Sequence, residues 1–134
     1  MDTQERIVRE VRKMTLAERK EIALRILSEV EKEVGTLDAT IRFRMLVPFA
    51  ESALGASYSP LPMSRRREDV MIRWFVAKQM AEEGYTRASI GRAMLRNHSS
   101  VTIMIKSVEA IQDGYYGKTA LRQYNDFKQR LQYD

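Results

Sequence analysis

The sequence predicts an all-α protein, a helical bundle with a C-terminal helix-turn-helix. Apolar residues recur at spacings of three and four along most of the chain, which is typical of amphipathic helices. Residues suited to start or end helices separate these stretches, among them Thr15, Gly84, Thr86 and Asn97. The 134 residues, of which 44% are hydrophobic, are enough for one domain with a real core.

Residues 1–55 are expected to form an N-terminal helical region. A short amphipathic helix is predicted from Thr3 to Met14, and Thr15 with Glu18 forms a capping box for the next helix. That helix is predicted from Leu16 to Val34, with Gly35 ending it in the left-handed conformation. Its apolar residues lie at helical spacing: Leu16, Ala23, Leu24, Leu27, Val30 and Val34.

A third helical segment is predicted from Asp38 to Leu54, with a kink or a restart at Pro48. Several of its residues are too apolar for an exposed element and are expected in the core: Phe43, Met45, Leu46, Val47 and Phe49. Residues 56–64 are expected to be a loop, stiffened by Pro60 and Pro62, that leads into a basic stretch. A plain interdomain linker is the alternative.

Residues 56–134 are expected to form the second domain. Its central helix is predicted from Arg67 to Glu83, with Trp74 and Phe75 in the core and not stacked on bases. A last helix is predicted from Thr119 to Leu131, and four of its residues are expected to pack inward: Leu121, Tyr124, Phe127 and Leu131.

Between these two helices, the stretch from Tyr85 to Ile111 predicts two helices with a very short join. The first is expected over Arg87 to Met94 with Thr86 as its N-cap, and the second from near Asn97 to Ile111. The second has an apolar stripe, which is expected to be buried: Val101, Met104, Ile105, Val108 and Ile111. Polar side chains fill its first turn and opposite face: Arg96, Asn97, His98, Ser99, Thr102 and Lys106. This is the arrangement of a helix-turn-helix, although any helical hairpin has one solvated face.

Positive charge is concentrated around this stretch. The formal net charge is +5, but residues 1–40 carry eight basic and nine acidic side chains, whereas residues 64–112 carry nine basic and five acidic ones. This asymmetry favours a polyanionic partner, with a solvated basic surface as the alternative. Arg65, Arg66 and Arg67 are suited to a narrowed minor groove, where the negative potential of DNA is strongest.

Several function classes are disfavoured by composition. The absence of cysteine excludes disulfides and thiolate metal sites, and a single histidine argues against zinc. Gly117-Lys118-Thr119 is not a phosphate loop, because only two residues separate Gly114 from Gly117 where that motif requires four. With no nucleophile–base pair, no signal peptide and no membrane span, we expect a cytoplasmic protein that is not an enzyme and needs no cofactor or metal.

Two blocks of sequence resemble the C-terminal DNA-binding domain of the bacterial replication initiator DnaA. Ile90-Gly91 followed by Arg96-Asn97-His98-Ser99-Ser100-Val101 is similar to the family's Ile-Gly pair and its arginine-aspartate-histidine-threonine-threonine-valine run. Upstream, residues 64–68 with Val70 and Arg73 look like the family's basic loop and the helix that follows it. The resemblance covers about Met45 to Gln112 and implies a Trp-repressor-like helical fold that binds double-stranded DNA.

The resemblance also implies roles for individual residues. Arg65 matches a minor-groove arginine, while Asn97, His98 and Ser99 match base-reading residues. The rest of the predicted DNA-binding set is Arg66, Arg67, Arg73, Arg96, Ser100, Thr102 and Lys106. Asn97 stands where the family has an aspartate, Ser99 and Ser100 replace threonines, and the join lacks one residue and the family's glycines. These departures leave the family's own target sequence in doubt.

We therefore expect a protein that binds double-stranded DNA with some sequence preference, in replication or in transcription regulation. The chain has no room for the family's ATPase domain. The alternative is a protein–protein interaction module on a helix-turn-helix scaffold that has lost DNA binding. The N-terminal helices are a candidate surface for a protein partner or for self-association.

Overall fold

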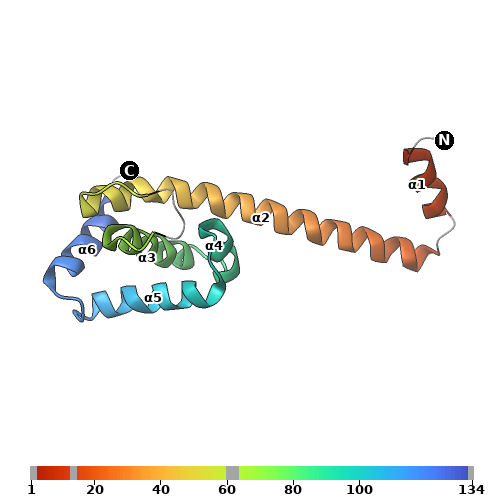
Figure 1. Ribbon diagram of the computed structural model, residues 1–134. Helices are drawn as coiled ribbons and strands as arrows, with labels where there is room; N and C mark the ends of the chain where they lie inside the picture. The colour runs from red at the N-terminus through yellow and green to blue at the C-terminus, as the bar shows by residue number, and fades with distance from the viewer. Residues whose placement is uncertain (1–2, 13–14, 60–63, 133–134) are drawn as a thin grey trace. The chain divides into compact units, whose positions relative to one another are not determined.

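The computed structural model describes residues 3–12, 15–59 and 64–132 (Figure 1). All regular secondary structure in these residues is α-helical, which confirms the predicted all-α bundle. The chain divides into two compact units, Met1–Gly35 and Thr36–Asp134. The predictions for Met14, Pro60 and Pro62 fall outside the described residues.

The first helices are α1 (Thr3–Arg12) and α2 (Leu16–Leu54). Thr15 caps α2 as predicted, because its Oγ1 accepts a hydrogen bond from the Glu18 N–H at 3.2 Å. The predicted helix end at Gly35 and the predicted restart at Pro48 are wrong, since one helix runs from Leu16 to Leu54 through both residues. A glycine in a helix interior costs only about 1 kcal/mol, and the turns on either side continue.

Packing explains why α2 passes through the proline. Ala39, Phe43, Leu46 and Ala50 recur at spacings of three and four on both sides of Pro48 and are all buried. Their burial stabilises the helical conformation more than the loss of one backbone hydrogen bond at Pro48 weakens it. These residues belong to the core of the second unit, which therefore begins about 20 residues earlier than the sequence boundary at residue 56.

The second unit is completed by α3 (Arg67–Glu82), α4 (Arg87–Met94), α5 (His98–Gln112) and α6 (Lys118–Gln132). α3 packs against α4 and α5, and α5 also packs against α4 and α6. Phe75, Tyr124 and Phe127 form an aromatic cluster at the α3–α6 contact, with ring centroids 5.2 to 6.3 Å apart. Burial without a described hydrogen-bond partner raises the pKa of the Tyr124 hydroxyl.

Polar contacts join residues 38 and 42 of α2 to residues 83 and 85, which follow α3. The Arg42 guanidinium donates two hydrogen bonds to the Glu83 carboxylate, at 2.6 and 2.8 Å, and the Tyr85 hydroxyl donates to Asp38 at 2.8 Å. The hydrogen bond from Arg42 lowers the pKa of Glu83. This clamp fixes the chain where α3 ends and α4 is about to begin.

The predicted core is confirmed in most positions. Phe43, Leu46 and Phe75 are buried, and four partly buried residues pack against this core, namely Val47, Trp74, Leu121 and Leu131. Phe49 is half-buried. The prediction for Met45 is wrong, because it lies beside the buried stripe of α2 and is 56% exposed.

Candidate nucleic-acid interface

A three-residue turn, 95–97, joins α4 to α5. Leu95 adopts the left-handed conformation with φ 58°, and its N–H donates to the Arg92 carbonyl. The Arg96 N–H donates to the Gly91 carbonyl at 2.7 Å and closes the end of α4. The predicted caps are confirmed on both sides, because Thr86 accepts from the Ser89 N–H at 3.1 Å and Asn97 from the Ser100 N–H at 2.8 Å.

Gly91 makes this turn possible. A Cβ atom at this position would lie 2.5 Å from the Arg96 carbonyl oxygen, closer than real Cβ contacts allow. This oxygen belongs to the backbone and not to a flexible side chain, so the clash can be relieved only if the turn itself moves. The glycine of the Ile90-Gly91 pair is therefore a packing requirement of the join between α4 and α5.

Gly91→Ala is expected to lower the free energy of unfolding by about 1–3 kcal/mol, the usual cost of overpacking. Urea unfolding followed by the fluorescence of Trp74 measures this directly. Gly35→Ala is the matched control, because Gly35 is helical and has no atom within 4 Å of its Cβ position. That change should be neutral or stabilise by up to about 1 kcal/mol. Equal effects of the two substitutions would contradict the steric role of Gly91.

α5 has one buried and one exposed face. The predicted stripe is buried throughout: Val101, Met104, Ile105, Val108 and Ile111. His98, Ser99 and Lys106 are exposed, and Arg96, Ser100 and Thr102 are half-buried. The Thr102 hydroxyl donates to the His98 carbonyl at 3.1 Å, so it is engaged within the helix. In the first turn of α5, His98 and Ser99 are therefore more exposed than Ser100.

Asn97 is exposed, but its cap limits what it can offer to a ligand. Because Oδ1 already accepts from the Ser100 N–H, the group left to face outward is the Nδ2 amide donor. A bidentate adenine contact, which uses the oxygen and the nitrogen together, would compete with the cap. A single donated hydrogen bond to a base acceptor suits this geometry better.

Ile103 of α5 and Arg87 of α4 are exposed and were not among the predicted contacts. Ile103 is 64% exposed and lies four residues after Ser99 on the outer face of α5. The sequence could have identified Ile103, because an apolar residue that lies outside the buried stripe of its helix faces solvent. Arg87 is exposed in the first turn of α4. An apolar side chain can contact a thymine methyl group, and an arginine can contact phosphate.

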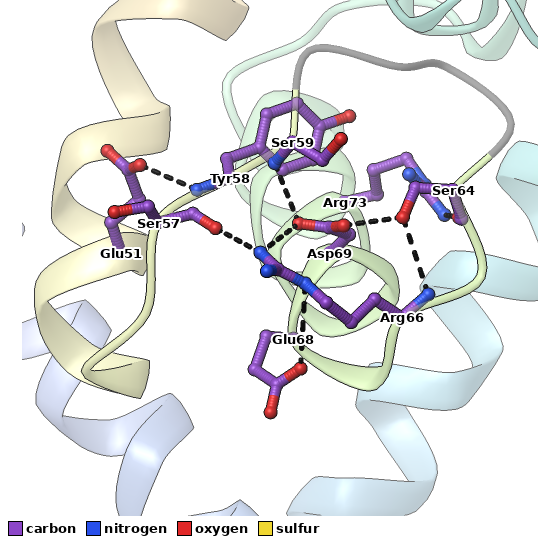
Figure 2. Close-up of polar contacts among 9 residues, drawn as sticks. All are labelled: Glu51, Ser57, Tyr58, Ser59, Ser64, Arg66, Glu68, Asp69 and Arg73. Atoms are coloured by element: carbon purple, nitrogen blue, oxygen red, sulfur yellow. Dashed lines mark hydrogen bonds and ion pairs between the residues drawn. The ribbon is translucent and has the colours of Figure 1, made fainter.

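The basic segment before α3 is held by the buried carboxylate of Asp69, as Figure 2 shows. Asp69 Oδ1 accepts hydrogen bonds from the Ser59 N–H at 2.8 Å and from Arg66 at 3.1 Å. Asp69 Oδ2 accepts from the Ser64 hydroxyl at 2.5 Å. One carboxylate thus holds both described ends of the loop, and we call Asp69 with these three partners the latch.

The three adjacent arginines have different surroundings. Arg66 is engaged in the latch, and it also donates to the Ser57 carbonyl and lies 3.9 Å from Glu68 (Figure 2). Arg65 and Arg67 are exposed, and neither makes a hydrogen bond or ion pair with the described part of the chain. Only these two arginines of the triplet can be offered to a ligand without breaking an existing contact.

Arg73 does not lie at the surface as a DNA contact would require. Its side chain is only 4% exposed, and its Nη2 donates to the Ser64 carbonyl at 2.6 Å. Arg73 therefore holds the end of the loop at Ser64, next to the latch. The resemblance to the DnaA family suggested a contact at Arg73, but this side chain is buried.

Hydrogen bonding sets the charge state of the latch. Burial raises the pKa of Asp69, yet the hydrogen bonds from Ser64, Ser59 and Arg66 and the charge of Arg66 outweigh it, and the pKa is lowered. Asp69 is therefore a carboxylate at neutral pH, able to accept all these bonds.

The two groups of exposed polar residues lie at opposite ends of α5. Arg65 and Arg67 line a pocket together with Trp74, Ile111 and Tyr116, which places them near the C-terminal end of α5. The Lys78–Glu109 ion pair at 3.5 Å fits the same antiparallel arrangement of α3 and α5. From His98 to Ile111 the helix rises about 20 Å at 1.5 Å per residue.

Comparisons with protein-family models, curated proteins and solved structures gave no match for this chain. Within residues 3–12, 15–59 and 64–132, no helix has the length and apolar character needed to cross a membrane. No group of three or more His, Cys, Asp or Glu side chains in these residues is arranged to hold a metal ion.

Proposed function

We propose that this protein binds double-stranded DNA with some sequence preference, through a DnaA-like helix-turn-helix made of α4, the turn at 95–97 and α5. The observation that carries the proposal is the exposure of His98 and Ser99 at the N-terminal end of α5, while the opposite face of that helix is buried. This end of the helix also carries free backbone N–H groups and the positive end of the helix dipole, which suit nearby phosphates. A role in replication or in transcription regulation fits such a protein.

The spacing of the two exposed groups supports binding to neighbouring grooves. One turn of B-DNA spans 34–36 Å, so adjacent major and minor grooves are about 17 Å apart along the duplex. The length of α5 between His98 and the end near Arg65 and Arg67 is about 20 Å. With α5 entering the major groove, the two arginines lie within reach of the next minor groove.

Selection of bound duplexes from a random pool tests the function. We expect enrichment of a defined site, with A·T pairs where Arg65 and Arg67 meet the minor groove. Absence of binding to any duplex at low salt would favour the other candidate, an interaction module on a helix-turn-helix scaffold. The exposed apolar residues of α2 are the observation in favour of that candidate.

His98→Ala is expected to separate base reading from phosphate contact. Loss of a base contact should cost about 1–3 kcal/mol on the selected site and little on random duplex. Lys106→Ala is the matched comparison, since Lys106 lies two turns further along the exposed face and should weaken both duplexes alike. Fluorescence anisotropy with both duplexes measures these ratios. A uniform loss in His98→Ala would assign that residue to the phosphate backbone.

A further inference from the structure

The sequence of α2 carries a long apolar stripe with exposed members in both units. Leu16, Leu27 and Val30 in the first unit are 49–69% exposed, and Leu37 and Ile41 in the second unit are 62% and 50% exposed. Apolar side chains on this scale along one helix face normally mark an interaction surface. We call this stripe the seam and define it as Leu16, Ala23, Leu27, Val30, Leu37 and Ile41.

The spacing of the seam is that of a coiled coil. Together with position 34, the seam positions from Ala23 onward are separated alternately by four and three residues: 23, 27, 30, 34, 37 and 41. Position 34 is a valine in the sequence, and its side chain is outside the described set. A seven-residue repeat of this kind keeps one face turned toward a partner helix that supercoils with it.

We propose that the seam joins two copies of this chain in a two-stranded coiled coil. One set of equivalent positions holds Lys20, Leu27, Val34 and Ile41, and the other holds Leu16, Ala23, Val30 and Leu37. The β-branched Val34 and Ile41 in the first set, with Leu16 and Leu37 in the second, favour two strands. Lys20 falls at a position equivalent to Leu27, and a single buried lysine of this kind selects register and low oligomer number. Residues 1–40 carry eight basic and nine acidic side chains, so two copies do not repel each other by net charge.

The inference does not depend on DNA binding, and solution mass tests it on the full chain. Sedimentation equilibrium should give twice the chain mass of 15.6 kDa. Leu27→Glu places two like charges in the seam and should weaken self-association at least about 100-fold. Ser28→Glu is the matched control, with the same added charge one residue away and off the seam, and should leave the dimer intact.

A further variant separates loss of the seam from loss of folding. Leu27→Ile keeps the seam apolar and should remain dimeric. Trp74, the one tryptophan of the chain, lies in the second unit, so its fluorescence should be unchanged in all three variants. Wild-type protein that is monomeric at tens of micromolar, or a Leu27→Glu variant as dimeric as Ser28→Glu, would overturn the proposal. A trimer or tetramer would equally refute the two-stranded form.

Discussion

Duplex DNA binding is expected to weaken about 500-fold when monovalent salt rises from about 50 to about 200 mM. The reason is the release of counterions from DNA, which gives a slope of log K against log salt of about −0.9 per phosphate neutralised. About five contacts correspond to a slope of about −4.5. The proposed interface carries five cations, namely Arg65, Arg67, Arg87, Arg96 and Lys106, of which Arg96 is half-buried.

The double variant Arg65→Ala/Arg67→Ala connects this slope to the structure. Loss of two contacts should change the slope to about −2.7, so the same rise in salt would weaken binding only about 40-fold. Arg130→Ala is the control, because it removes a cation near the end of α6 whose ion pair with Asp126 is exposed. A slope unchanged in the double variant would show that the basic segment lies off the DNA.

Local signals predicted most of the second unit. Thr86 and Asn97 identify the starts of α4 and α5, because a cap needs only a side-chain oxygen and an N–H three residues away. The buried stripe of α5 was predictable for the same reason, since one helix face is defined within a few turns. Because His98 and Ser99 lie outside the buried stripe, their exposure was predictable as well.

Features that depend on distant contacts were not predictable in this way. Gly35 and Pro48 are local helix breakers, but the packing of residues 39 to 50 against the second unit decides the length of α2. The different surroundings of Arg65, Arg66 and Arg67 depend on Asp69, whose burial follows from the position of α3 in the bundle. The sequence shows three equal arginines, whereas the latch engages the middle one.

Removal of the Asp69 carboxylate is the substitution with the largest expected effect on stability. Asp69→Ala should lower the free energy of unfolding by about 3 kcal/mol, because two hydrogen bonds from Ser59 and Ser64 to a buried charge are each worth about 1.5–3 kcal/mol. Arg66 adds little to this figure, since its side chain is 54% exposed and water screens the pair. Urea unfolding followed by Trp74 fluorescence gives the value.

Two comparisons test the chemistry behind that loss. Asp69→Asn keeps an acceptor for the Ser59 N–H but replaces the other oxygen by a donor, so it should lose less than alanine does. Glu68→Ala removes the neighbouring carboxylate, whose distance to Arg66 is 3.9 Å, and should change stability by no more than about 0.5 kcal/mol. Equal losses of stability in Glu68→Ala and Asp69→Ala would show that the hydrogen bonds of the latch do not hold this loop.

The pH dependence of the same variants has a defined sign. The pKa of Asp69 is lower in the folded protein than its ordinary value of 3.8, so its stabilisation is complete above that value and is lost as pH falls through the folded pKa. The stability difference between wild type and Asp69→Ala should therefore be constant at neutral pH and shrink in strong acid. At neutral pH, the loosened loop should present Arg65 and Arg67 less well, so Asp69→Ala should also shift the salt slope of DNA binding toward that of the double arginine variant. A salt slope identical to wild type, with stability reduced as expected, would limit the latch to folding.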